Sequence, residues 1–142
     1  MKTFSAKAQD VERAWYVIDA KDQVLGDVAV AAANLLRGKT KPIFTPNVDT
    51  GDFVVVVNAA AVKVTGRKET AKTYTSFSGY IGGLKRETVA GVRGRKPELL
   101  VERAVRGMIP HNRLGRQIIG KLKVYAGAEH PHAAQQPVPY AL

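Results

Sequence analysis

The stretch that most restricts the fold is Phe53–Asn58, with the sequence FVVVVN. Four consecutive valines favour a strand, because β-branched side chains pack well on a pleated surface. The run does not alternate between apolar and polar residues, so neither face of such a strand belongs in water. Strands buried on both faces are typical of parallel sheets with chain packed on either side. The run therefore predicts an α/β fold.

Three further apolar runs extend this sheet: Trp15–Ala20, Val62–Thr65 and Leu122–Tyr125. Leucine, valine and alanine recur at helical spacing across residues 25–36, and Gly38 ends that pattern. We predict a three-layer α/β/α arrangement around a four-stranded, mainly parallel sheet. Residues 1–142 are expected to form a single domain. Its last part, about 128–142, contains three prolines and is expected to be an extended tail.

The segment Arg106–Gly127 combines an apolar stripe with cations and contains no acid. The pattern predicts a helix ending near Pro110 and a second helix that begins after Asn112, which is a good N-cap residue. In the second helix one face carries Arg113, Arg116, Gln117 and Gly120, at i, i+3, i+4 and i+7. Arginine forms bidentate, charge-assisted bonds with phosphate. This face, with Lys121 and Lys123 beyond it, is a candidate RNA contact.

Positive charge is concentrated in one part of the chain. The net charge is +10, and residues 63–123 hold fifteen Lys or Arg against four acids, whereas residues 1–62 hold seven of each. A clustered surplus of this size indicates a polyanionic partner. An anionic membrane surface fits less well, because no long basic amphipathic helix is present.

Two more basic segments lie between the predicted helices. The first, residues 72–87, interleaves glycines, aromatic rings and cations and is predicted to be a loop that contacts RNA backbone and unstacked bases. Its candidate residues are Lys72, Tyr74, Ser78, Gly79, Tyr80, Gly82, Gly83, Lys85 and Arg86. The second is a basic turn that could continue a phosphate track, with Arg93, Arg95 and Lys96.

Most catalytic classes lack their signatures here. Cysteine is absent, which excludes disulfides and thiolate chemistry, and neither GxxxxGK[ST] nor GxGxxG occurs. His130 and His132 have no third ligand at a useful spacing for zinc. Asp49 and Asp52 could hold Mg²⁺ in a nuclease, although DTGD before a strand is ordinary turn chemistry. We expect no catalytic residue, metal, cofactor or small-molecule substrate.

The N-terminal residues lack the apolar core of a signal peptide, and no apolar run approaches the roughly 20 residues of a membrane span. The chain is therefore expected to be cytoplasmic and to have no membrane partner.

The motifs, taken together, resemble the bacterial large-subunit ribosomal protein L13 family almost from end to end. The matching pieces are WYVIDA, VLGDVA, RGKTKPIFTPNVDTGDFVVVVNA, KVTGRK, KTYTSFSGYIGG, RKPELLVERAVRGMIPHNRLGR and KLKVYAGAEHPHAAQQP. Two positions depart from the pattern. Asp27 stands where many members have Arg, and His111 stands where many have Lys.

The resemblance implies a structural constituent of the large subunit that binds rRNA, lies near other ribosomal proteins and joins early in assembly. It implies no catalytic role and no cofactor. It also implies rRNA contacts at the SGYIGG loop with Lys85, at Arg113 and Arg116, and at Lys121 and Lys123. An alternative is a translational regulator that binds mRNA with the same basic face.

Overall fold

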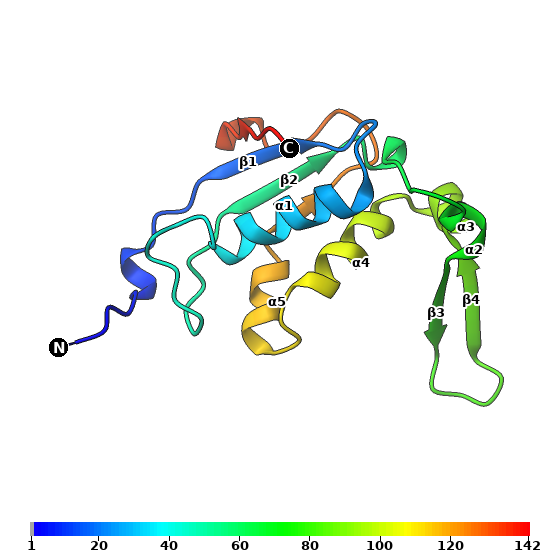
Figure 1. The fold of residues 1–142 in the computed structure, drawn as a ribbon, viewed down its shortest axis with the longest axis horizontal. Coiled ribbons are helices and arrows are strands. Elements are labelled where there is room, and N and C mark those ends of the chain that lie inside the picture. Colours follow the sequence, from blue (N-terminus) through cyan, green and yellow to red (C-terminus); the bar gives the residue numbers. More distant parts are fainter. Residues whose placement is uncertain (1) are drawn as a thin grey trace.

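A parallel sheet with the strand order β5-β2-β1-β6 forms the centre of the structure, a computed structural model that describes residues 2–142 (Figure 1). The strands are β1 (Trp15–Asp19), β2 (Phe53–Val57), β5 (Leu122–Val124) and β6 (Val138–Pro139). All three pairings are parallel, and Ile18, Val56 and Val124 lie side by side in register. The predicted α/β fold with a four-stranded parallel sheet is confirmed.

Helices cover one face of this sheet (Figure 1). They are α1 (Leu25–Arg37), α3 (Val89–Arg95), α4 (Glu98–Met108) and α5 (Arg113–Ile119), with the short α2 (Lys68–Ala71) beside α3. As predicted, α1 ends at Gly38, whose φ of 76° places it in the left-handed region that glycine tolerates. Short 3-10 turns occupy Ala8–Asp10, Ala59–Ala61 and Ala133–Gln135.

The hydrophobic core lies between the sheet and these helices. Ile18, Val54 and Val56 project from the sheet, and Leu36 of α1 and Leu100 of α4 pack against them; all five are fully buried. Alternate residues of a strand point to opposite faces, so the valines between them point away from the helices. Val55 is also fully buried, which confirms that β2 is covered on both sides.

The C-terminal segment covers the second face of the sheet. Trp15 and Phe53 stack there at 4.5 Å between ring centroids, and the His132 ring lies 5.2 Å from that of Trp15. The chain then returns to the sheet as β6, after which the backbone N–H of Tyr140 donates to the carbonyl of Val17 at 2.9 Å. The third layer is thus formed by residues 125–137, with one short 3-10 turn, rather than by a long helix.

The fourth strand was predicted in the wrong place. Val62–Thr65 makes only a single bridge, between Lys63 and Val24, because it lies at the entry to α1 beyond the end of the sheet. The sheet is instead completed by Val138 and Pro139 of β6, in the segment predicted to be an extended tail. A proline is tolerated there because β6 is an edge strand, where one side of the backbone needs no partner.

Candidate nucleic-acid interface

The segment predicted to be a glycine-rich loop is a β-hairpin that projects from the body (Figure 1). Its strands are β3 (Thr73–Phe77) and β4 (Leu84–Thr88), antiparallel and in full register. Gly79 and Gly82, with φ of 90° and 76°, form the turn. The sequence indicated a loop because both faces of the hairpin are largely exposed, so threonine, serine and lysine take positions that buried strands fill with apolar residues.

The tip of the hairpin presents large side chains to solvent. Phe77 is 66% exposed, Tyr80 is 80% exposed and Ile81 is completely exposed. Lys85 and Arg86 follow on β4, also exposed, and neither makes an ion pair within residues 2–142. The structure therefore places exposed rings beside cations without an ion pair, the combination that unstacked bases and phosphates require, and contact with RNA stays a prediction.

Tyr74 occupies a different environment from the other predicted ring, Tyr80. Its ring packs against the core, with Arg103 of α4 at 4.9 Å and Lys72 at 5.4 Å from its centroid. Burial raises the pKa of its phenol. Because two cations already lie over the ring, Tyr74 fixes the hairpin to α4 and does not offer a free stacking face.

The predicted basic turn is in fact the last part of α3, and Thr88 accepts a capping bond from the N–H of Gly91 at 3.2 Å. Arg93 in this helix points inward. Its guanidinium donates to both carboxylate oxygens of Glu69, at 2.8 and 3.1 Å, and to the carbonyls of Ala60 and Val62. This pairing lowers the pKa of Glu69. Arg93 therefore holds α2 and α3 to the body.

Arg95 is also paired within the chain. Its guanidinium donates to the carboxylate of Glu87 through Nε at 3.1 Å and Nη2 at 2.7 Å, and this contact lowers the pKa of Glu87. Lys96, the third predicted residue of this group, is exposed and has no ion-pair partner among the described residues 2–142.

We expect Arg93→Ala to lower the free energy of unfolding by about 2 kcal/mol, because it removes hydrogen bonds from one carboxylate and two backbone carbonyls. Urea unfolding followed by circular dichroism measures the loss. The control Lys96→Ala should change stability by less than about 0.5 kcal/mol, since its side chain is exposed. Equal effects of the two substitutions would contradict the anchoring role of Arg93.

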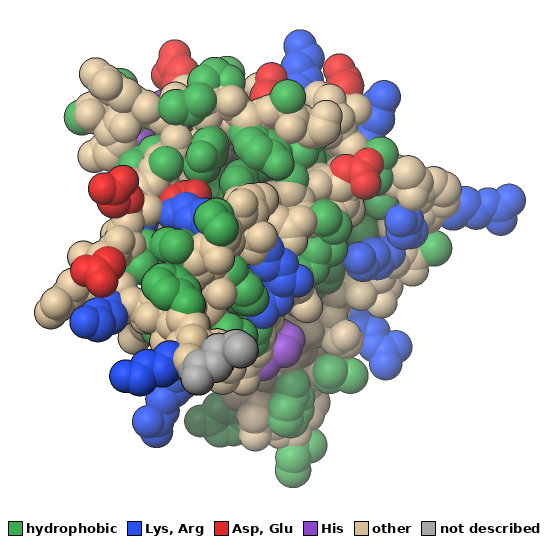
Figure 2. Space-filling model, turned by 60° about the vertical axis from the view of Figure 1, so that its left-hand side comes forward, with side chains coloured by type: hydrophobic (Ala, Val, Ile, Leu, Met, Phe, Trp, Pro, Cys, Tyr) green, Lys and Arg blue, Asp and Glu red, His purple; other side chains and the backbone are tan. Residues whose placement is uncertain are grey.

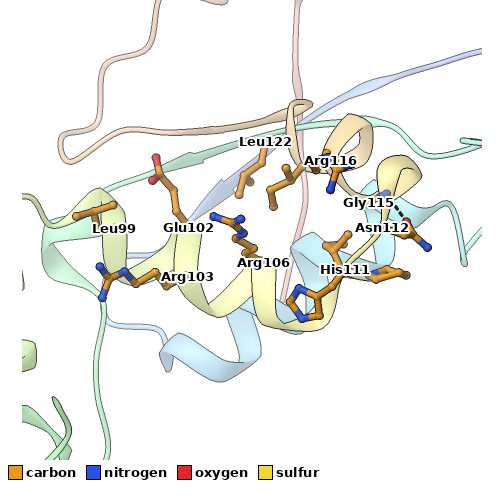
Figure 3. A pocket seen from close by; sticks show the side chains of 12 residues that line it. Leu99, Glu102, Arg103, Arg106, His111, Asn112, Gly115, Arg116 and Leu122 are labelled. Atoms are coloured by element: carbon orange, nitrogen blue, oxygen red, sulfur yellow. Dashed lines mark hydrogen bonds between the residues drawn. The ribbon is translucent and has the colours of Figure 1, made fainter. Parts of the chain in front are cut away.

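Helix α5 begins as predicted. The Asn112 side chain accepts from the N–H of Gly115 at 2.8 Å, and Gly115 lies so close to the Pro110 carbonyl that no side chain would fit (Figure 3). This tight turn sets α5 against the end of α4. Arg113 and Arg116 are exposed and make no ion pair in residues 2–142.

The two lysines beyond α5, both predicted to contact RNA, lie in different environments. The ammonium of Lys121 is buried, where it donates to Asp49 at 2.5 Å and to the carbonyl of Leu36 at 3.1 Å. Burial lowers the pKa of Lys121, and the Asp49 carboxylate opposes that shift. Lys121 is therefore a structural residue. Lys123 belongs to β5 and pairs with Val55 of β2. Its side chain therefore points to the sheet face that the C-terminal segment covers, away from α5.

Two hollows connect the hairpin with α5. One, of about 700 Å³, lies between the hairpin strands β3 and β4, α3 and α4, and is lined by Lys85, Arg86 and Arg103 and by the Glu87–Arg95 pair. The other, of about 490 Å³, lies between α4 and α5 and includes Arg103, Arg106 and Arg116 (Figure 3). Arg103 lines both, so the hollows adjoin. We call the five cations Lys85, Arg86, Arg103, Arg106 and Arg116 the basic track.

Sequence reasoning did not select Arg103 and Arg106 as site residues. The sequence feature that could have identified them is their spacing, since residues three apart on a helix share a face. Figure 2 shows the wider charge pattern: the acids in that view lie in its upper half and on its left, whereas Lys and Arg also reach the right edge and the lower left.

The histidines and aspartates singled out in the sequence form hydrogen bonds and ion pairs within the chain. His132 Nε2 lies 2.6 Å from the Tyr125 hydroxyl, and His130 Nδ1 accepts from the His132 N–H at 3.2 Å. Asp52 accepts from Lys41 at 2.7 Å and from the Ala14 N–H at 3.0 Å. Within residues 2–142 no three His, Asp or Glu side chains gather to hold a metal, and no helix is long and apolar enough to cross a membrane.

Comparison with known proteins identifies the family of the chain. The family model described as ribosomal protein L13 matches residues 13–131. The chain belongs to the ribosomal protein L13 family. Three relatives each bear the name large ribosomal subunit protein uL13. That of Akkermansia muciniphila is 67% identical over all of both chains. Those of Nocardia farcinica and Methylacidiphilum infernorum are 60% and 55% identical over all of this chain and 97% and 99% of theirs.

Membership in the L13 family makes the chain a structural constituent of the large ribosomal subunit and not an enzyme. The predicted identity is confirmed.

Proposed function

We propose that the chain binds and organises large-subunit rRNA during an early step of subunit assembly. The observation that supports this most directly is the basic track: five cations from β4, α4 and α5 line two adjoining hollows, and none of them makes an ion pair in residues 2–142. Phosphate is the ligand that neutralises such a surface, with release of counterions. Arg113 on α5 and the exposed hairpin tip extend it at either end.

The rigidity of the frame supports a scaffolding role. Arg116 lies on a helix fixed by the Asn112 cap, the hairpin is fixed to α4 by Tyr74, and Arg93 holds the helices α2 and α3 that flank it. Contacts with phosphate position a protein on RNA but read little sequence, so selectivity would come from the match between the folded RNA and this fixed set of cations. A chain with its own buried core does not need other proteins to form this surface, which suits it to bind early.

The double substitution Arg113→Ala and Arg116→Ala tests this function. We expect it to weaken association with large-subunit rRNA and to reduce the slope of log K against log salt by about 2, because two phosphate contacts are lost. The thermal unfolding curve should not change, since both side chains are exposed. Filter binding over a range of salt concentrations measures the affinity, and incorporation into subunits in cells measures assembly.

The control is Lys21→Ala with Lys39→Ala, which removes the same charge from exposed positions in the neutral part of the chain. It should bind rRNA almost as the parent does. If the arginine variant enters subunits as efficiently as the parent, the rRNA-contact role of α5 is wrong.

A further inference from the structure

The hollow between α4 and α5 differs from the rest of the basic track because it has an apolar floor. Ile109, Ile119 and Leu122 line it together with Leu99, and all four pack against the hydrophobic core. Its volume of about 490 Å³ falls in the range of roughly 300–1,000 Å³ in which proteins hold small organic groups. A flat phosphate-binding surface would need neither the depth nor the apolar floor.

Two guanidinium groups enter this hollow from opposite sides. Arg106 extends from α4 and Arg116 from α5, and these two side chains point towards the space between the helices, whereas Arg103 is directed away towards Tyr74 (Figure 3). Neither Arg106 nor Arg116 forms an ion pair within residues 2–142. One anion placed between them would receive charge-assisted bonds from both.

Glu102 on the rim of the hollow makes this part of it unfavourable for a phosphate. Glu102 lines the same hollow, and its carboxylate makes no ion pair in the described part of the chain, residues 2–142. A carboxylate repels a phosphate but accepts hydrogen bonds from the amino groups of a nucleobase. The hollow thus combines an apolar floor, one acceptor and a pair of cations.

We propose that this hollow holds a single nucleotide extruded from the bound RNA. Its base lies on the Ile119 and Leu122 floor and its phosphate lies between Arg106 and Arg116. The inference rests on the proposed RNA-binding function and makes it more specific. RNA-binding proteins obtain selectivity from unpaired bases that leave the helical stack, and a bulged base is already partly unstacked. An acidic peptide would match the cations, but it would set its carboxylates against Glu102.

The test compares three fluorescent RNA hairpins bound to the full-length protein at fixed salt. One contains a single bulged cytidine, the second has an abasic site at the bulge, and the third is fully paired. We expect the bulged RNA to bind about tenfold more tightly than the paired RNA, and the abasic RNA to lose most of that advantage. The Ile119 methyl resonance in a methyl-labelled sample should shift only with the bulged RNA.

The variant Arg106→Gln should reduce the preference for the bulge to within about twofold while the parent thermal unfolding curve is kept, because Arg106 is exposed. The matched control Lys21→Gln should keep the full preference. Equal binding of all three RNAs would overturn the extruded-nucleotide site and leave the proposed function standing, whereas no binding of any RNA would overturn both. Binding of an acidic peptide that shifts Ile119, with no preference among the RNAs, would also overturn the proposal in favour of a protein partner.

Discussion

The substitution Val56→Asp is expected to prevent folding. Val56 is fully buried at the centre of β2, hydrogen-bonded between β1 and β5, and its side chain packs in the main core. An aspartate there would place an unpaired charge, or a protonated carboxyl without a partner, among aliphatic groups. The cost is several kcal/mol, comparable with the roughly 5–15 kcal/mol that stabilises a typical domain.

The measurement is far-ultraviolet circular dichroism with thermal unfolding of the purified variant. The parent should show a cooperative transition and the variant none. Val30→Asp is the matched control, because Val30 is 48% exposed on α1 and its replacement leaves the charge in water. A cooperative transition of Val56→Asp close to that of the parent would contradict the burial of β2 against the helices.

The contrast between β2 and β6 shows what the sequence could and could not predict about the fold. The position of Phe53–Val57 in the sheet is predictable because all of its side chains are apolar, and such a run indicates a strand buried on both faces. Val138–Pro139 is exposed and only two residues long, and its place in the sheet depends on where the chain returns after covering Trp15. Nothing local in two such residues distinguishes an edge strand from a tail.

The hairpin shows the same limit for exposed elements. Thr73–Phe77 and Leu84–Thr88 have no continuous apolar face, so the usual two-residue alternation is absent and the glycines dominate the pattern. The pairing becomes clear only when Tyr74 is seen between Arg103 and the core. Helix α3 was missed for a related reason, because Gly91 and Gly94 weaken its helical pattern and the basic residues at its end resemble a solvated turn.

In the candidate site, residue type was predictable but the direction of a side chain was not. Cations at 93, 95 and 121 look identical in sequence to those at 85, 106 and 116, yet the first three find partners in Glu69, Glu87 and Asp49. These partners lie 24, 8 and 72 residues away along the chain. Such pairing is a property of the fold, so composition overestimates the charge that is free to meet RNA.

Lys121 provides the clearest test of whether a cation is paired within the chain or free to contact RNA. Its side chain is only 8% exposed, and it bridges the Asp49 carboxylate and the last turn of α1 through the Leu36 carbonyl. Lys121→Met keeps most of the aliphatic stem but leaves Asp49 facing Arg13 alone, at 4.0 Å. We expect the free energy of unfolding to fall by about 3 kcal/mol, because removing one partner of a buried pair leaves the other charge uncompensated. Urea unfolding measures the change.

Two comparisons separate this structural role from a role in RNA contact. Adding Asp49→Asn to Lys121→Met removes the stranded charge and keeps an oxygen for the Gly51 N–H, so the double variant should regain about 1–2 kcal/mol. Lys123→Met makes the same replacement two residues later, in β5, and should alter the free energy of unfolding by less than about 0.5 kcal/mol. If Lys121→Met leaves stability unchanged and only weakens rRNA binding, then the ammonium reaches RNA, and its pairing with Asp49 is not what the fold requires.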